Sequence, residues 1–292
     1  MHQTPLLLAL FYGRLDIARV LLDGGATTPN SDFDWPSLHV VLRGIYDFEQ
    51  DRINVVRLLL EHGADVHAQD KVHATPLQLA SCNGMVEIAR ILLDAGATTN
   101  SKSLLGRSPL HAAVEGRPSP FINNHVLLAK LLLEHGAELD MLDDDDRTPL
   151  HLASYFGKVE MALTLLNAGA YTNAMDAEGQ TPLHLVVVVS RFLDDSQGDR
   201  VGIVQLLLDH GADMNAKDHN RATSLDLASI HKRTEIIALF LQYGGKGDAA
   251  KIDNQRAAHQ RGLASVQLLD EDCTSSRSAT LVRERLPLWL PR

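Results

Sequence analysis

The sequence has few aromatic residues, few cysteines and no long apolar run. Aromatics make up 5% of the 292 residues, so we expect a core of Leu, Ala, Val and Ile. The two cysteines, Cys82 and Cys273, show no local spacing motif, which argues against a disulfide scaffold or a cysteine metal site. No apolar run approaches the roughly eighteen residues that span a bilayer, and the N-terminus lacks a signal-peptide pattern. We therefore expect a cytoplasmic protein, with the nucleus as the alternative.

The charge and the missing motifs narrow the function. A net charge of −10 repels nucleic acid backbones and anionic membranes, so a protein partner is expected, with a basic surface on that partner as one option. The sequence shows no nucleophile elbow, phosphate loop, HExxH pair or CxxC pair. We accordingly expect no enzyme activity, no catalytic residue, no cofactor, no metal and no small-molecule substrate.

A short motif recurs along the chain. TPLH at 148–151 and 181–184 has variants elsewhere: TPLL at 4–7, PSLH at 36–39, TPLQ at 75–78, SPLH at 108–111 and TSLD at 223–226. After the motif, each of the first six copies runs through an apolar segment to a Gly-Ala signal such as LLLEHGAD, and the seventh ends in FLQYGG. The motif leucines are spaced by 32, 39, 33, 40, 33 and 42 residues, so the base period is near 33 and the even copies carry extra residues.

Each copy has the signals of a helix pair. Thr or Ser followed by Pro starts a helix, because the hydroxyl caps free N–H groups and Pro fits the first helical position. A glycine such as Gly157 ends the first helix, and a second such as Gly169 ends the apolar segment that follows. The linking segments have the Asp and Gly content of turns.

This combination of period, TPLH motif and Gly-Ala ending resembles the ankyrin repeat. The resemblance implies an all-α repeat fold, an ankyrin solenoid of stacked helix-turn-helix units with turn or hairpin fingers, over residues 1–248. A C-terminal helix, within 250–269, and a disordered tail would fill 249–292. The expected repeats are 2–30, 31–69, 70–102, 103–142, 143–175, 176–217 and 218–248.

His151 could suggest acid–base chemistry, but the repeat argues otherwise. Its equivalents are Leu7, His39, Gln78, His111, His184 and Asp226, so the position accepts several residue types. The resemblance implies that this histidine bonds backbone and the Thr hydroxyl and ties neighbouring repeats together. His62, His135 and His210 precede a C-capping glycine, where we also expect a structural role.

The binding surface is expected on the concave side of the stack, at the finger tips and the ends of the first helices. Exposed aromatic residues there would serve as anchors, although Phe11 and Phe156 have the alternative of packing under adjacent turns. The candidate partner-binding residues are Phe11, Tyr12, Phe33, Trp35, Arg43, Lys71, His73, Asn83, Leu104, Leu105, Asp144, Asp145, Tyr155, Phe156, Glu178, His219 and His231.

The fingers differ in the residue that precedes the motif and in the charge of their tips. Gly106 and Gly179 supply the positive φ that the family prefers before the motif, whereas Asp34, His73, Asp146 and Arg221 are expected to be strained or reshaped there. Residues 143–146, with Asp140 nearby, form an acidic tip. A solvated or partner-binding finger is favoured over a calcium loop, because the spacing lacks the pattern of an EF-hand.

The even-copy insertions and the first copy leave alternatives open. The insertions, 44–51, 116–124 and 190–199, are placed between the two helices of a pair, and each carries one phenylalanine: Phe48, Phe121 and Phe192. Duplication of a two-repeat unit explains them without function, and an edge binding site is the alternative. The first copy, with its apolar helix PLLLALFY, leaves an uncapped edge that either continues into a longer product or meets a partner or second copy.

Two functions remain in contention. The leading hypothesis is a non-catalytic protein–protein interaction module that holds a partner on the concave face and finger tips. The alternative is a substrate-selecting adaptor whose C-terminal tail docks on a larger complex such as a ubiquitin ligase.

Overall fold

The computed structural model describes residues 4–27, 36–44, 49–116, 124–188 and 199–244. Within these ranges all regular structure is α-helical and no β-strand forms. The helices are α1 Pro5–Phe11, α2 Leu15–Asp23, α3 Ser37–Arg43, α4 Glu49–Glu61, α5 Pro76–Cys82, α6 Val86–Asp94, α7 Pro109–Glu115, α8 Asn124–Glu134, α9 Pro149–Tyr155, α10 Val159–Asn167, α11 Pro182–Val187, α12 Arg200–Asp209, α13 Ser224–Ile230 and α14 Thr234–Gly244.

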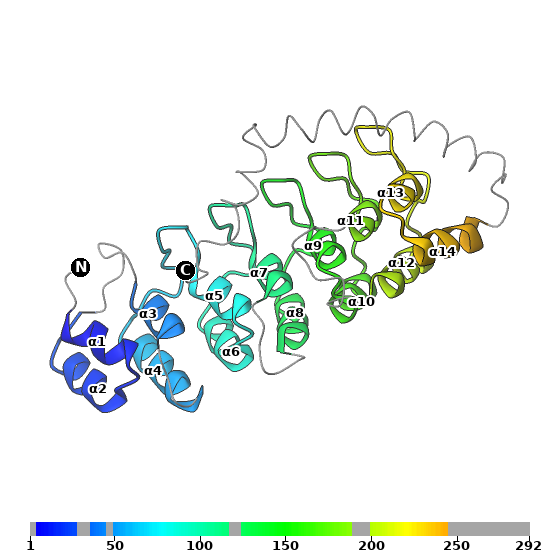
Figure 1. Ribbon diagram of the computed structural model, residues 1–292. Coiled ribbons are helices and arrows are strands. Elements are labelled where there is room, and N and C mark those ends of the chain that lie inside the picture. Colours follow the sequence, from blue (N-terminus) through cyan, green and yellow to red (C-terminus); the bar gives the residue numbers. More distant parts are fainter. Residues whose placement is uncertain (1–3, 28–35, 45–48, 117–123, 189–198, 245–292) are drawn as a thin grey trace. The chain divides into compact units, whose positions relative to one another are not determined.

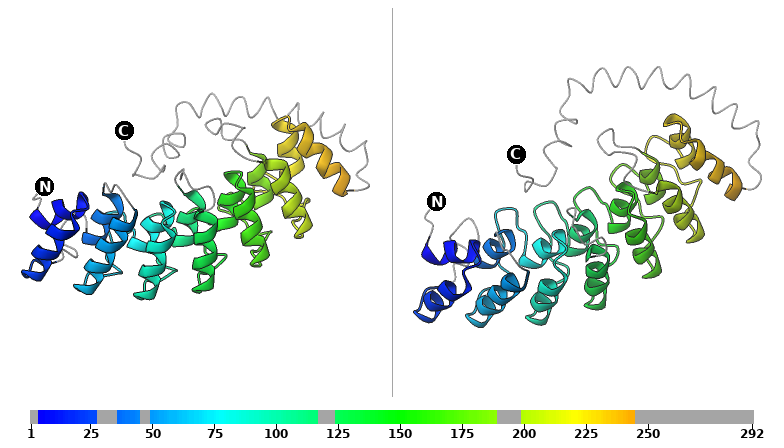
Figure 2. Two further views of the ribbon diagram at one scale, coloured as in Figure 1. Left: turned by 90° about the horizontal axis from the view of Figure 1, so that it is seen from below. Right: turned by 60° about the horizontal axis from the view of Figure 1, so that its bottom comes forward.

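The chain divides into two compact units, Met1–Ser224 and Leu225–Arg292. In the first unit, each odd-numbered helix packs against the next odd-numbered helix, and each even-numbered helix packs against the next even-numbered one. The pairs α1–α2 to α11–α12 therefore stand in a row, with the first helices on one side and the second helices on the other (Figures 1 and 2). In the second unit, the described residues contain α14 and nearly all of α13. Figure 1 labels the helices of both units. The expected all-α stack of helix pairs is confirmed.

The predicted helix starts are confirmed at most of the motifs. Thr75, Ser108 and Thr148 each accept a hydrogen bond from the backbone N–H three residues later, and Pro occupies the first turn. At α3 the residue in the cap position is Pro36, which has no hydroxyl and makes no side-chain cap. The first helix of that pair therefore lacks the cap that its neighbours have.

The core is a seam of aliphatic side chains that runs through the row. Leucines at the motif, such as Leu77, Leu110 and Leu150, are fully buried, and so are Ile88, Leu128 and Leu165 in the second helices. The low aromatic content fits this core, since Leu, Ala, Val and Ile fill it almost alone. None of the helices within the described residues is long and apolar enough to cross a membrane.

The placement of the even-copy insertions needs one correction. Residues 44–51 and 116–124 were expected to lie wholly between the two helices, but α4 already begins at Glu49 and α8 at Asn124. Part of the added length thus extends the second helix, with Glu49 and Asp51 placed favourably in the first turn of α4. Phe48, Phe121 and Phe192 lie outside the described residues.

Candidate functional site

The fingers are the segments between one helix pair and the next, and each has a base and a tip. The base residue is Asp70, Ser103, Asp143, Asp176 or Asp218, and the tip consists of the three residues after it. The backbone N–H of the base residue donates to the carbonyl oxygen four residues later, for example Asp143 to Arg147 at 3.0 Å. Each finger is therefore a closed turn, and the tips are 71–73, 104–106, 144–146, 177–179 and 219–221.

The aspartates at the bases belong to the scaffold. One carboxylate oxygen of Asp143 accepts the backbone N–H groups of Asp145 and Arg147, both at 2.9 Å. Asp70, Asp176 and Asp218 repeat this arrangement. Asp140, near the same tip, accepts the N–H of Tyr171 at 3.0 Å. The acidic tip predicted at 143–146 is thus divided: the carboxylate of Asp143 is buried in the turn, whereas Asp144 and Asp146 are exposed. Within the described ranges, no group of three or more His, Cys, Asp or Glu residues is placed to hold a metal ion.

Backbone hydrogen bonds join the five tips into one row. In each bond, an N–H of one tip donates to a carbonyl oxygen of the tip before it. The four bonds are Leu104 to Val72 at 2.9 Å, Asp144 to Leu105 at 3.2 Å, Ala177 to Asp145 at 3.0 Å and His219 to Glu178 at 3.1 Å. We call the side chains of these tips the finger-tip surface. It brings together eight of the predicted binding residues: Lys71, His73, Leu104, Leu105, Asp144, Asp145, Glu178 and His219.

The tips keep one backbone shape despite their different sequences. Gly106 and Gly179 have φ of 70° and 73°, as predicted, and His73 and Arg221 adopt the same left-handed region at 56° and 64°. Asp146, at 57°, does so as well. These fingers are therefore strained rather than reshaped, while Asp34 lies outside the described residues. A Cβ atom at Gly106 would lie 2.7 Å from the backbone nitrogen of Asp144, so close packing also requires glycine there.

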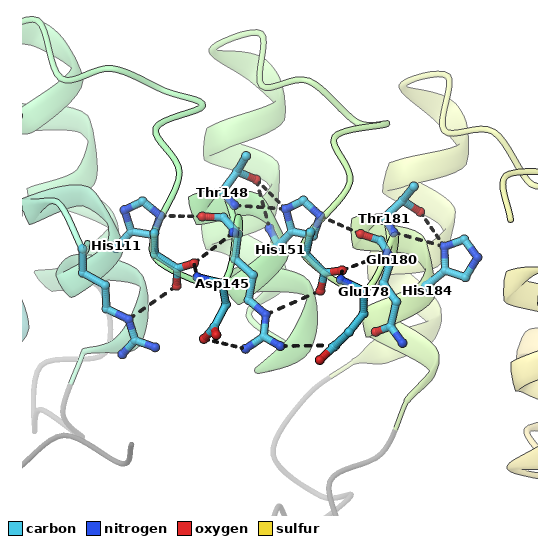
Figure 3. A network of polar contacts seen from close by, with 12 residues as sticks. His111, Asp145, Thr148, His151, Glu178, Gln180, Thr181 and His184 are labelled. Carbon is cyan, nitrogen blue, oxygen red and sulfur yellow. Dashed lines mark hydrogen bonds and ion pairs between the residues drawn. The ribbon is translucent and has the colours of Figure 1, made fainter. Parts of the chain in front are cut away.

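The motif histidines tie their first helices to the finger that follows, and Figure 3 shows this for His111 and His151. The Nδ1 atom of His151 accepts the backbone N–H of Thr148 at 3.1 Å, and its Nε2 lies 3.0 Å from the carbonyl oxygen of Gln180. Since Nδ1 is an acceptor, the proton sits on Nε2 and is donated to Gln180. His111 and His184 make the same contacts with Arg147 and Ala222. The prediction that His151 is structural is confirmed.

Two deviations show what this tie requires. Gln78 replaces histidine, yet its Oε1 accepts the Thr75 N–H at 2.7 Å and its Nε2 donates to the carbonyl oxygen of Arg107 at 2.6 Å. The position therefore accepts glutamine as well as histidine, since both offer one acceptor and one donor across this span. His39 keeps only half of the tie: Nε2 bonds to Ala74 at 2.7 Å, but Nδ1 has no partner. Pro36, which precedes it by three residues, supplies neither an N–H nor a hydroxyl.

Burial keeps these histidines neutral. It lowers the pKa of His111 to about 4 and outweighs the hydrogen bond to Arg147, which acts to raise it. The same cause lowers the pKa of His39, His151 and His184. A cation at these positions would face a protein interior rather than solvent. These neutral histidines hold neighbouring repeats together, and they are not suited to proton transfer at neutral pH.

The histidines at the ends of the second helices are also structural. The Nδ1 atoms of His135 and His210 lie 2.8 Å from the carbonyl oxygens of Leu131 and Leu206, in the last turn of their own helices. His62 lies 3.3 Å from the carboxylate of Asp23 in the preceding pair. The rings of His135 and His210 thus contact carbonyl groups that already accept the backbone N–H of the same histidine, and the ring of His62 links two neighbouring pairs.

The ends of the first helices carry the predicted aromatic pairs. Phe11 and Tyr12 make an edge-to-face contact with ring centroids 5.2 Å apart, and Tyr155 and Phe156 make the same contact at 5.2 Å. Tyr12 is exposed, whereas Phe11, Tyr155 and Phe156 are half-buried. Each pair thus combines a partly packed ring with accessible aromatic surface.

Lys158 makes two contacts that the sequence did not predict. Its Nζ lies 5.9 Å from the ring centroid of Phe156 and donates to the carbonyl oxygen of Val114 at 2.7 Å. It therefore caps α7 in the preceding pair while it contacts the aromatic pair of its own. Burial lowers the pKa of Lys158. A lysine directly after the glycine of the first helix was the available signal, but its partner lies 44 residues away.

Arg147 is the second residue that the prediction missed. Its Nε lies 3.5 Å from buried Asp176, and its terminal nitrogens lie 3.8 Å from both Asp145 and Glu178 (Figure 3). One guanidinium thus links a finger base to acidic residues on two adjacent tips. The signal was a basic residue immediately before a TPLH motif whose next finger begins with Asp.

Five further predicted residues stand apart from the finger-tip surface, and two lie outside the described residues. Arg43 binds buried Asp70 at 2.6 Å, so its charge is already engaged. Asn83 caps the end of α5 and is half-buried. Phe11 and Tyr12 lie in the first pair, and His231 belongs to the second unit. Phe33 and Trp35 are outside the described residues.

Comparison with known proteins agrees with this geometry. A family model described as ankyrin repeats in three copies matches residues 45–123, one for many copies matches 110–166, and the single ankyrin repeat matches 1–32 and 178–219. The chain belongs to the ankyrin repeat family. Ankyrin repeats generally mediate protein–protein interactions, and the family is typically non-enzymatic.

The similar proteins are diverse in name and much longer. The chain is 30% identical over 202 residues to the putative ankyrin repeat protein FPV031 of Fowlpox virus. This match covers 67% of this chain and 45% of that protein. It is 32% identical over 114 residues to the E3 ubiquitin-protein ligase KEG of Arabidopsis thaliana, or 39% of this chain and 7% of that protein. It is 31% identical over 145 residues to human neurogenic locus notch homolog protein 2, or 40% and 6%. The chain thus spans less than half of each relative.

Proposed function

We propose that this ankyrin repeat protein is a non-catalytic binding module that holds a partner protein along the finger-tip surface and the ends of the first helices. One observation supports this most directly: hydrogen bonds between backbones hold the tips in a row, so the row itself does not depend on side chains such as Leu104 and Asp144. The bases and the histidine ties maintain the stack. Residues such as Leu104 and Asp144 are therefore available to a partner.

The charges of the tips favour a partner with a basic surface. Asp144, Asp145 and Glu178 lie on adjacent tips, and Leu104 on the neighbouring tip is an exposed apolar contact. Arg147 offsets part of this charge, since it is loosely paired with Asp145 and Glu178. A basic segment that crosses these tips would gain complementary charge and would associate faster at low salt. The aromatic pair at Tyr155 and Phe156 would add an apolar anchor.

A matched pair of variants tests this function. The tip variant combines Leu104→Ser, Asp144→Ser and Glu178→Ser. The control combines Leu127→Ser, Glu134→Ser and Glu160→Ser on α8 and α10, where one apolar and two acidic side chains are likewise lost. With immobilised full chain as bait, a specific partner identified by mass spectrometry should be retained by the wild type and the control and lost by the tip variant. Equal capture by all three chains would contradict the proposed surface.

The same measurement addresses the adaptor alternative. Two similar proteins, KEG and XBAT34 of Arabidopsis thaliana, are named as E3 ubiquitin-protein ligases, the second as putative. A chain that lacks residues 272–292 should lose one captured protein and keep the tip-dependent one if the tail docks on a larger complex. Retention of every captured protein by the shortened chain favours the simple binding module.

A further inference from the structure

The first helix pair exposes three apolar side chains whose equivalents in the third pair are buried. Leu8 on α1 is 39% exposed, and Ile17 and Val20 on α2 are 54% and 71% exposed. In the third pair, the residues at these positions are Leu79, Ile88 and Ile91, with exposures of 2%, 0% and 7%. We call the face formed by Leu8, Ile17 and Val20 the leading face.

The stacking order explains the contrast. Helices α1 and α2 pack against each other and, on one side, against α3 and α4, and Leu6, Leu10 and Leu22 of this first pair are buried. The third pair packs against a preceding and a following pair, α3–α4 and α7–α8. Its additional buried positions are therefore those covered by the preceding pair. Those positions in α1–α2 have no such neighbour within the described residues.

The remaining pairs support this assignment of the leading face. The residue that corresponds to Ile17 is always large, apolar and fully or almost fully buried, and so is the one that corresponds to Leu8 in the first helices of the fifth and sixth pairs. These equivalents are Val55, Leu128, Met161 and Ile203 for Ile17, and Leu152 and Leu185 for Leu8. A surface designed to face water would carry polar residues here. The leading face instead keeps the composition of an internal stacking surface.

We propose that the leading face is a docking surface for one further ankyrin-type helix pair, distinct from the finger-tip surface. It would continue the established seam, because the same positions receive such a pair throughout the row. The occupant should be of the even kind. The third and fifth pairs are each preceded by an even-numbered pair, α3–α4 and α7–α8. The second helices of these even-numbered pairs, α4 and α8, have 13 and 11 residues, whereas the second helices of the odd-numbered pairs, α2, α6 and α10, have 9.

The fit can be measured with the chain's own fourth repeat as the probe. Residues 103–147 are placed directly before Thr4, so that Arg147 precedes Thr4 as it precedes Thr148 in the native chain. If the leading face accepts this pair, the thermal midpoint of the transition that includes α1–α2 should rise by about 5 °C. The matched variant carries Leu8→Glu and Ile17→Glu. Without the graft it should resemble the wild type, since both side chains are exposed, and with the graft it should gain nothing.

Three outcomes would overturn the proposal. The first is a graft that leaves the midpoint of the wild type unchanged, and the second is a graft that raises the midpoint of the Leu8→Glu, Ile17→Glu variant by the same amount. Sedimentation equilibrium of the ungrafted chain supplies the third outcome. A dimer that the double substitution dissociates would show that the leading face pairs with a second copy and not with an even-type helix pair.

Discussion

Asp143 and Asp144 are adjacent in the chain, yet they belong to different parts of a finger. Asp143 is at the base, where its buried carboxylate accepts two backbone N–H groups and lies 3.6 Å from Nε of Arg107. Asp144 is at the tip, where its backbone N–H bonds to Leu105 and its side chain is exposed. The fold depends on the base, and the tip is available for recognition. A run of four aspartates therefore conceals two unlike environments.

The prediction with the largest expected effect tests this difference between the base and the tip of a finger. Asp143→Ala removes both carboxylate hydrogen bonds and leaves backbone N–H groups without a partner, so we expect a loss of about 3 kcal/mol in the free energy of unfolding. Asp144→Ala should change it by less than about 0.5 kcal/mol, as for other exposed sites. Urea unfolding of both variants, followed by circular dichroism, measures the difference. Similar losses would mean that the tip is as structural as the base.

The pH dependence of stability tests the part that the histidine ties play in the scaffold. Well above pH 6.5 the imidazole of His111 is neutral in both the folded and the unfolded chain. As the pH falls, the unfolded chain binds a proton near 6.5, whereas the folded chain resists until its pKa of about 4. His111 should therefore cost about 3 kcal/mol of stability progressively between pH 6.5 and pH 4. Partial burial raises the pKa of Glu115, which contributes a change of the opposite sign.

The matched control for this prediction is His111→Gln, because Gln78 already makes the same tie. At pH 7.5 the variant should be nearly as stable as the wild type. At pH 4.5 it should be the more stable of the two, since glutamine does not titrate. Parallel stability curves for the two chains between pH 7.5 and pH 4.5 would show that this histidine does not resist protonation.

The parts of the structure that the sequence predicts are those encoded by neighbouring residues. A cap joins Thr148 to the residue three positions on, and a left-handed turn depends on a single residue such as Gly179. The repeat then extends these local signals to seven copies. Helices, caps, finger positions and the role of His151 could therefore be predicted without the structure.

The contacts that sequence reasoning missed join residues far apart. Arg43 was expected at the binding surface, but it pairs with Asp70, 27 residues later. Arg147 reaches a finger base as well as two tips, and the start of α4 within an insertion depends on packing that a period does not encode. Charge pairing across repeats is set by side-chain reach. A motif alone does not say which of several nearby acids a guanidinium will meet.

The smallest expected effect concerns strain at the tips. His73 holds φ at 56°, a conformation that costs an ordinary residue about 1 kcal/mol and costs Asp or Asn less. His73→Gly relieves this strain, but glycine gains entropy in the unfolded chain, which offsets part of the benefit. We expect a net stabilisation of about 0.5 kcal/mol.

Asp146→Gly is the matched control for the effect of strain, since Asp146 adopts φ of 57° on a neighbouring tip of the same design. The short polar side chain of aspartate can hydrogen-bond locally in this region, so the substitution should give no stabilisation, or a slight loss. Urea midpoints of the two variants, measured beside the wild type, should therefore differ in sign or size. An equal gain at both positions would indicate that the relief comes from the loss of a side chain at the tip and not from backbone strain. In that case the tips would be shaped by their side chains as well as by their turns, and the division between base and tip would be less sharp than the hydrogen bonds indicate.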